Sequence, residues 1–360
     1  MSSKVLSIAS ALVLSAGLAS AEVPKVSADI APVHSLVSKV MNGLGKPYLI
    51  IPAEASPHEY QLKPSEAKSL QESKLVFWIG EDLTPWLEKG LSTLAKNATI
   101  TTLLKAEGIE LLDFREGALF EAHDHSDHDD HDDHDHGKHK KKDDHDDHDD
   151  HDHGKHKKKD DHDDHDDHDH GKHKKKDDHD DHAGHEGHDH GEHDPHAWLS
   201  PGIAKVWLNL IAAKLSEVDP NNASTYFSNA SSAIKDLDTL SDEINKILDP
   251  IRKEKFVVFH DAYQYFENYF NISASGAISL GDASDPSPAR LKETKERVEK
   301  EDIHCVLAEP QFNEGLVKAV IEGTHANNAI IDPLGVSLEI GPNLYDKLIR
   351  NLAINLSNCF

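Results

Sequence analysis

The chain has 360 residues and a formal net charge of −28, which arises from 66 acidic and 38 basic side chains. No basic patch is evident, and this composition argues against a nucleic-acid partner. Outside a signal-like N-terminus and a low-complexity tract, about 265 residues remain, which is enough for two domains of ordinary size.

Residues 1–21 have the pattern of a secretory signal peptide. Lys4 supplies the positive region, residues 5–18 are apolar, and residues 19–21 form a small-residue cleavage site. The apolar run is too short to span a bilayer as an ordinary helix, and no later segment is apolar enough to do so. We therefore expect an exported protein that begins at Glu22 and is not embedded in a membrane.

Short β-rich runs alternate with helical runs in the first part of the chain. The predicted strands are 25–30, 48–51, 75–79 and 99–103, and the predicted helices are 32–41, 65–72, 84–94 and one that opens at Ser200-Pro201. Alternation of this kind favours a parallel α/β sheet flanked by helices. We assign residues 22–219 to an N-terminal α/β lobe.

A tract at residues 121–194 interrupts this lobe and contains 23 of the 29 histidines. A 17-residue unit at 143–159 recurs unchanged at 160–176 and, with one difference, at 126–142. The tract lacks apolar periodicity, so we expect it to be disordered without metal. Imidazoles beside carboxylates predict many low-affinity metal sites. In each full repeat, three histidines spaced three residues apart represent these ligands. They are His128, His131, His134, His145, His148, His151, His162, His165 and His168.

Residues 220–248 are predicted to form one long helix, with Asp219-Pro220 at its start. At 1.5 Å per residue such a helix spans about 40 Å, long enough to pack across two domains and hold them apart. Its predicted apolar stripe has three-and-four spacing. The stripe comprises Phe227, Ala230, Ile234, Leu237, Leu240, Ile244 and Ile247.

The remaining residues, 249–360, repeat the α/β rhythm and are assigned to a C-terminal lobe. The predicted strands are 256–259, 274–280, 304–308 and 329–331, and the predicted helices are 262–269, 287–300, 314–323 and 343–356. This lobe contains the only cysteines, Cys305 and Cys359. Export favours a disulfide between them, with two buried thiols as the alternative.

Three histidines outside the tract lie where ligands bind in parallel α/β sheets, beyond the carboxyl ends of strands. His58 lies in the loop after the strand 48–51, His260 follows the strand 256–259, and His196 lies just past the tract. Asp332 follows the strand 329–331. The physical hypothesis is a cleft between two lobes, where three imidazoles and one oxygen form a tetrahedral site suited to Zn²⁺.

Other polar residues receive less specific predictions. His34, near the start of the first helix, is a candidate to line the cleft, and Glu309 is a candidate to orient a ligand histidine, with a structural salt bridge as the alternative. His304 is expected to be buried at a strand start, and His325 to be exposed near a helix end. The four tryptophans are expected to be core residues.

Five segments of the sequence resemble those of the ZnuA family, the periplasmic zinc-binding proteins of bacterial high-affinity zinc ABC importers. They are Ser56-Pro57-His58-Glu59-Tyr60, Pro195-His196-Ala197-Trp198-Leu199-Ser200-Pro201, Val258-Phe259-His260-Asp261-Ala262-Tyr263, Ala308-Glu309-Pro310-Gln311-Phe312 and Asp332-Pro333-Leu334-Gly335. The resemblance implies two α/β lobes joined by a long rigid helix, with zinc in the cleft between them. It also implies a disulfide in the second lobe, like the pair Cys305 and Cys359.

The resemblance carries three ligand histidines over to His58, His196 and His260. An imidazole at His260, where manganese-binding relatives have a carboxylate, favours zinc. The fourth ligand stays open between Asp332, Glu59 and water, because Pro57 stands where some zinc-binding relatives have an acidic residue. The implied protein is a monomer in the periplasm of a Gram-negative bacterium, and its partner is the membrane permease with its ATPase.

The leading hypothesis is therefore a solute-binding protein that captures Zn²⁺ and delivers it to an ABC permease. The tract would be an accessory element that collects, buffers or senses zinc with low affinity. The alternatives are a zinc hydrolase, a storage or adhesive metal protein, and a carrier of Mn²⁺, Ni²⁺ or Cu²⁺. Because no metalloprotease helix or nucleophile elbow is present, we do not expect an enzyme.

Overall fold

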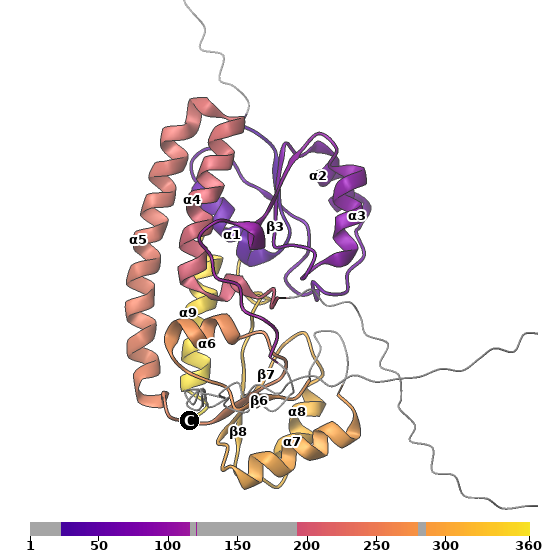
Figure 1. The fold of residues 1–360 in the computed structure, drawn as a ribbon, viewed down its shortest axis with the longest axis vertical. Helices are drawn as coiled ribbons and strands as arrows, with labels where there is room; N and C mark the ends of the chain where they lie inside the picture. The colour runs from indigo at the N-terminus through magenta and orange to yellow at the C-terminus, as the bar shows by residue number, and fades with distance from the viewer. Residues whose placement is uncertain (1–22, 116–119, 121–192, 280–285) are drawn as a thin grey trace, which may run out of the picture. The chain divides into compact units, whose positions relative to one another are not determined.

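The computed structural model describes residues 23–115, 120, 193–279 and 286–360 (Figure 1), and all of them fall in one structural unit. The predicted signal peptide and the histidines named for the tract lie outside the described residues. Within the described ranges, no helix combines the length and the apolar character needed to cross a membrane.

The described residues form two four-stranded sheets with the same strand order, β2-β1-β3-β4 and β6-β5-β7-β8, and every pairing within them is parallel. The strands of the first sheet are β1 (Val26–Ala28), β2 (Tyr48–Leu49), β3 (Leu75–Trp78) and β4 (Thr99–Thr102). Those of the second are β5 (Phe256–Val258), β6 (Gly276–Ala277), β7 (Cys305–Ala308) and β8 (Asn327–Ile330). The predicted α/β class with two parallel sheets is confirmed.

The helices join these strands and cover the sheets. In chain order they are α1 (Ala31–Val40), α2 (Pro64–Glu72), α3 (Pro85–Leu94), α4 (Pro201–Val218), α5 (Ala223–Leu248), α6 (Gln264–Phe270), α7 (Pro288–Lys300), α8 (Glu314–Ile321) and α9 (Leu344–Ser357). Proline occupies the first turn of α4 and of α7, where its missing N–H costs nothing. The Ser200 and Ser287 hydroxyls cap these two helices by accepting from Ile203 N and Arg290 N.

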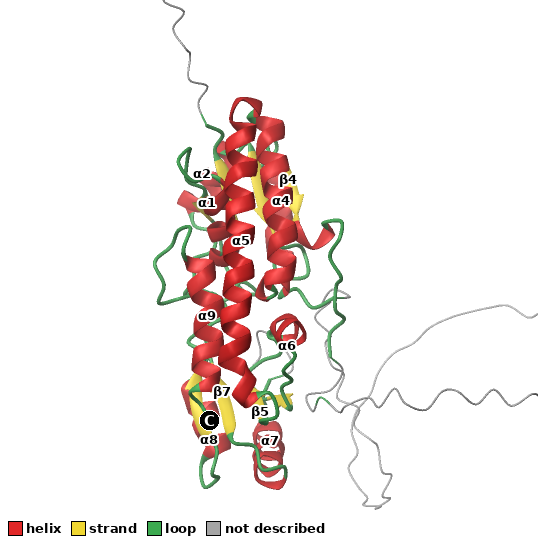
Figure 2. Ribbon diagram, turned by 90° about the vertical axis from the view of Figure 1, so that its left-hand side faces the viewer, coloured by secondary structure: helices red, strands yellow, loops and turns green. Residues whose placement is uncertain are grey.

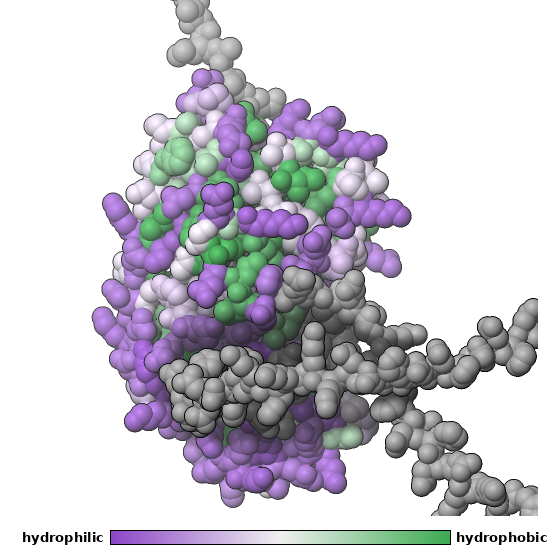
Figure 3. All heavy atoms as spheres, viewed as in Figure 1, coloured by the Kyte–Doolittle hydropathy of each residue, from purple (hydrophilic) through white to green (hydrophobic). Residues whose placement is uncertain are grey.

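The second sheet is covered on both faces, as the side-chain alternation of a strand requires. Val257, Phe259 and Val306 point into a small apolar cluster with Val298 of α7 and Val317 of α8. The neighbouring strand residues point into the larger core on the other face. Figure 3 shows mainly hydrophilic side chains on the outside of α7 and α8, so these two helices present their polar sides to solvent.

The long helix α5 packs along α4 and also contacts α1, α6 and α9 (Figure 2). It begins later than predicted, because residues 220–222 form a separate 3-10 turn. Its buried stripe also differs at the start: Tyr226 is buried, whereas Phe227 is 48% exposed. Tyr226 can enter the core because its hydroxyl donates to Asp219 Oδ2 at 2.8 Å, which pairs its only polar atom.

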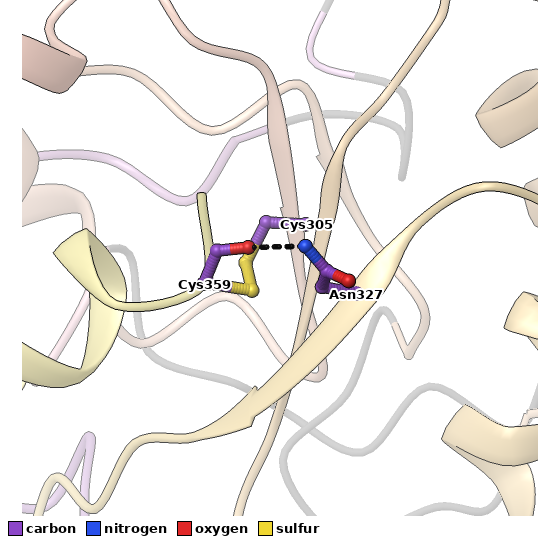
Figure 4. The surroundings of a disulfide bond; sticks show 3 residues. All are labelled: Cys305, Asn327 and Cys359. Carbon is purple, nitrogen blue, oxygen red and sulfur yellow. Dashed lines mark hydrogen bonds between the residues drawn. A yellow bond between two sulfur atoms is a disulfide. The ribbon is translucent and has the colours of Figure 1, made fainter.

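A disulfide joins Cys305, the first residue of β7, to Cys359 after α9 (Figure 4), as predicted. Both cysteines are buried. Asn327 of the neighbouring strand β8 donates from Nδ2 to the Cys359 carbonyl at 2.8 Å. The C-terminal helix is therefore fixed covalently to the amino-terminal edge of the second sheet.

Candidate metal site

The structure brings His58, His196 and His260 together, although 138 and 64 residues separate them in sequence. Within the described ranges they are the one group of histidine, cysteine or acidic residues able to hold a metal ion, and their ligand atoms lie within 4.8 Å of one another. A tetrahedral zinc ion with Zn–N bonds near 2.0–2.1 Å would place its nitrogens about 3.3 Å apart. A small approach of the rings would therefore complete the site.

The three imidazoles line a cavity of about 20 Å³, which is room for one ion or one water molecule. The rest of its wall is largely apolar and includes Trp198, Phe312 and Leu334. Phe312 stacks on Phe259 with ring centroids 4.5 Å apart. A dry wall of this kind lowers the local dielectric and strengthens the bonds of a metal to its ligands.

Buried carboxylates orient two of the three rings. His196 Nδ1 donates to Asp194 Oδ1 at 2.7 Å, and His260 Nδ1 donates to Glu309 Oε1 at 2.6 Å. Because a carboxylate can only accept, both rings carry their proton on Nδ1 and keep the Nε2 lone pair for a metal. The orienting role that the sequence predicted for Glu309 agrees with this contact.

The contact between His260 and Glu309 follows from the strand order. Strands β5 and β7 are paired neighbours at the centre of the second sheet, and His260 and Glu309 lie just beyond their carboxyl ends. Between these two strands the connections change direction, and α/β proteins bind ligands at such a switch point.

Asp194 is a residue of the site for which no role was predicted from the sequence. It is 1% exposed, and its Oδ1 also accepts from the backbone N–H of His196 at 2.9 Å. An acidic residue two positions before a candidate ligand was a usable signal, because a short Asp side chain readily bonds to the backbone two residues on.

Replacing Asp194 by asparagine is expected to weaken zinc binding about 10- to 100-fold, the usual cost of losing an orienting partner. The amide keeps one acceptor but loses the charge that supports a metal-bound imidazole. A competition titration with a chromophoric chelator measures the change. Asp113→Asn is the matched control, because Asp113 is exposed and bonds His193 instead, at 2.8 Å; equal losses in both variants would contradict the orienting role.

His58 is held by the loop after β2. The indole N–H of Trp86, in the first turn of α3, donates to the Pro57 carbonyl at 2.8 Å and so fixes the backbone next to His58. Trp86 is only half-buried, so its prediction as a core residue missed this contact. Glu59 is exposed and does not belong to the histidine group.

A partly buried charge cluster braces the loop that carries His260. Arg115 donates to Asp261, the residue after His260, at 2.9 Å and to Glu267 of α6 at 2.8 Å. Burial raises the pKa of Asp261, and the bond and charge of Arg115 oppose that shift. Burial lowers the pKa of Arg115, but the charges of Glu267 and Asp261 outweigh it and raise the pKa above its ordinary value. No pattern in the sequence indicated this long-range cluster.

The structure does not bring Asp332 into the histidine group. Its carboxylate accepts from the backbone N–H groups of Leu334, Gly335 and Val336 at 3.0, 2.8 and 2.6 Å. It also accepts from Gln311 Nε2 at 3.3 Å. The Asp332 carboxylate thus stabilises the loop that follows it. The sequence alone did not predict these hydrogen bonds, because they depend on the direction of the local backbone.

Two predictions about the other histidines are wrong and one is confirmed. His34 does not line the cavity: its ring bonds the Pro47 carbonyl at 3.1 Å inside the fold, and burial lowers its pKa. The side chain of His304 is 48% exposed and pairs with Glu254, because it precedes β7 instead of entering the strand. His325 is exposed, as predicted.

The comparison with known families identifies the family to which this chain belongs. The profile of ZnuA, described as "Zinc-uptake complex component A periplasmic", matches residues 26–359. The chain belongs to the ZnuA family. Relatives named "High-affinity zinc uptake system protein ZnuA" include one from Paracoccus denitrificans, 41% identical with 97% of this chain and 98% of the relative covered. Another from Brucella abortus is 40% identical, covering 93% of this chain and 91% of the relative.

Solved structures share the ZnuA fold at lower identity. A crystal structure of ZnuA superposes with a TM-score of 0.66 at 20% identity, covering 93% of this chain and 98% of the other. A zinc-bound ZnuA deletion mutant gives 0.65 at 20% identity, covering 93% and 97%. A binding protein in complex with Mn²⁺ gives 0.66 at 16% identity, covering 93% and 97%. Proteins of this fold thus hold different metals, and the fold alone does not determine which.

Proposed function

We propose that this chain is the zinc-capturing component of a high-affinity uptake system and binds one Zn²⁺ ion through His58, His196 and His260. It would acquire the ion in the periplasm and deliver it to the permease of an ABC importer. The observation that carries the proposal is the convergence of three imidazoles on one ion-sized cavity. Membership of the ZnuA family supports the physiological setting.

The ligand set favours zinc over manganese. Imidazole suits Zn²⁺, Cu²⁺ and Ni²⁺, whereas Mn²⁺ prefers oxygen ligands. Asp194 and Glu309, the buried acids next to the site, bond the Nδ1 atoms of His196 and His260. They do not belong to the group of three possible metal ligands. The names of the relatives specify zinc uptake, which makes zinc the proposed cargo.

The shape of the site favours transport over catalysis. A cavity of about 20 Å³ accommodates an ion or a water molecule, whereas pockets for small-molecule substrates measure about 300–1,000 Å³. A zinc hydrolase would have to admit its substrate next to the metal. We therefore propose a binding protein and no enzymatic reaction.

Several features of the proposal concern parts of the molecule beyond the site. Residues 1–21 would direct export to the periplasm, residues 220–248 would link an N-terminal lobe at 22–219 to a C-terminal lobe at 249–360, and the protein would act as a monomer. The histidine-rich tract would hold zinc in weak sites close to the cavity. A high local concentration of such sites favours recapture of an ion that dissociates.

A zinc titration against a competing chromophoric chelator tests this division of roles. The mature chain is compared with a form in which a short Gly-Ser linker replaces residues 122–188. This deletion preserves the antiparallel bridge between Asp113 and His193 at the base of the tract. We expect several weak sites to disappear and one tight site to remain. Loss of the tight site with the tract would instead favour a storage or buffering protein.

A further inference from the structure

Gln311 lies next to the three histidines but has no role in the function proposed above. It follows β7 in the same loop as Glu309, and its side chain lines the cavity together with His58, His196 and His260. It is the one amide side chain in that wall. The wall also contains Ser56, Glu309 and several apolar residues, and a polar side chain in such a lining is positioned to choose the ligand of the cavity.

The orientation of the Gln311 amide is fixed by Asp332. Gln311 Nε2 donates to Asp332 Oδ1 at 3.3 Å, and a carboxylate cannot offer a donor in return. Asp332 is itself immobilised by the three backbone N–H groups of its loop. The amide nitrogen must therefore face Asp332, and the carbonyl oxygen must lie on the other branch of the side chain.

That carbonyl oxygen is buried and has no hydrogen-bond partner among the described residues. Buried acceptors are nearly always paired, so an orphaned one calls for a ligand or a bound water. Three imidazoles leave one position open on a tetrahedral metal, and Gln311 lines the cavity in which that ion would lie. The residue with the unpaired oxygen and the three histidines therefore line the same cavity.

We propose that Gln311 is a specificity-determining residue that keeps the fourth position of the metal neutral. In this arrangement, which rests on the proposed function, its carbonyl oxygen accepts a hydrogen bond from a water molecule bound to the ion. Asp332 acts one step further out, as the residue that orients the amide. Asp332, which its sequence position suggested as a ligand, thereby contributes to the site without placing its charge on the metal.

A neutral fourth position affects which metal binds. Three imidazoles and one water give Zn²⁺ the nitrogen-rich, tetrahedral environment that it favours, while Mn²⁺ gains most from carboxylate oxygens. A carboxylate at residue 311 would supply such an oxygen. The amide at this position thus discriminates against oxygen-seeking ions that the same fold accommodates in other proteins.

Two substitutions of similar size test the proposal in the full-length mature protein. Gln311→Met removes the acceptor, and Gln311→Glu adds a charge. We expect Gln311→Met to weaken Zn²⁺ binding about tenfold, the lower end of the cost of losing an outer-shell partner. We expect Gln311→Glu to shift the ratio of Zn²⁺ to Mn²⁺ affinity by about tenfold toward Mn²⁺. The matched controls are the same changes at Gln71, which is exposed on α2.

A spectroscopic measurement distinguishes a change in metal coordination from misfolding of the variant. With Co²⁺ in the site, visible absorption reports the geometry and the fourth ligand, and we expect both Gln311 variants, but neither Gln71 variant, to change it. Unchanged zinc affinity, metal ratio and Co²⁺ spectrum in the Gln311 variants would overturn the inference, and either variant alone suffices if the other does not fold. Failure of the unmodified protein to bind zinc tightly would instead overturn the proposed function.

Discussion

Replacing His260 by alanine is expected to weaken zinc binding by more than about 100-fold. Loss of a residue that only orients a ligand costs about 10- to 100-fold, and loss of the ligand itself should exceed that cost. The change also leaves Glu309, which is 2% exposed, without the imidazole that pairs it. A competition titration with a chelator of known affinity measures the effect on the metal-binding constant.

The matched control is His304→Ala. His304 also lies next to a strand of the second sheet, immediately before β7, but its side chain is 48% exposed and pairs with acids on the surface. Exposed pairs of this kind contribute little to stability, so this variant should bind zinc like the unmodified protein. Equal affinity in the His260→Ala and His304→Ala variants would remove His260 from the proposed site.

The sequence was sufficient to predict the architecture because its signals are local. Ser-Pro pairs mark the starts of α4 and α7, and short apolar strands alternate with helices through both halves. The candidate ligands were predictable for a related reason. His58, His196 and His260 follow strands or precede a helix at positions where a parallel sheet collects its functional residues, and all three meet.

The residues that support the ligands were harder to predict, because their contacts depend on which strands become neighbours. Glu309 reaches His260 only because β7 pairs with β5. Arg115 reaches Asp261 across 146 residues of sequence. The spacing of residues within one segment cannot predict such long-range contacts, because the packing of the whole domain decides the direction of the chain after each strand.

Two residues show how local geometry adds to what a sequence pattern predicts. The spacing of apolar residues placed Phe227 on the buried stripe of the long helix, but the stripe begins at Tyr226, where a hydroxyl partner is available in Asp219. The position of Asp332 after a strand suggested a metal ligand. Its carboxylate instead accepts the N–H groups of the tight turn that follows it, which is a common role for Asp at a turn.

Removing the disulfide is expected to lower the free energy of unfolding by about 4 kcal/mol without changing zinc affinity more than about twofold. The bond closes a 54-residue separation, and in the chain-entropy model a loop of that length gives a cost of about 4 kcal/mol. The double variant Cys305→Ala with Cys359→Ala is preferable to serine substitutions, because both positions are buried and an unpaired hydroxyl would add its own cost.

The expectation for zinc follows from the direction of β7. Cys305 is its first residue and Glu309 follows its last, so the bond lies at the edge of the sheet opposite the metal site. At about 3.3 Å per residue, the four residues of the strand separate the two features by more than 10 Å. Denaturant unfolding and a zinc titration of the same double variant measure the two quantities separately. A reducing agent should destabilise the unmodified protein to the level of the variant and leave the variant unchanged; a variant as stable as the unmodified protein would show that α9 is held to β7 by packing alone.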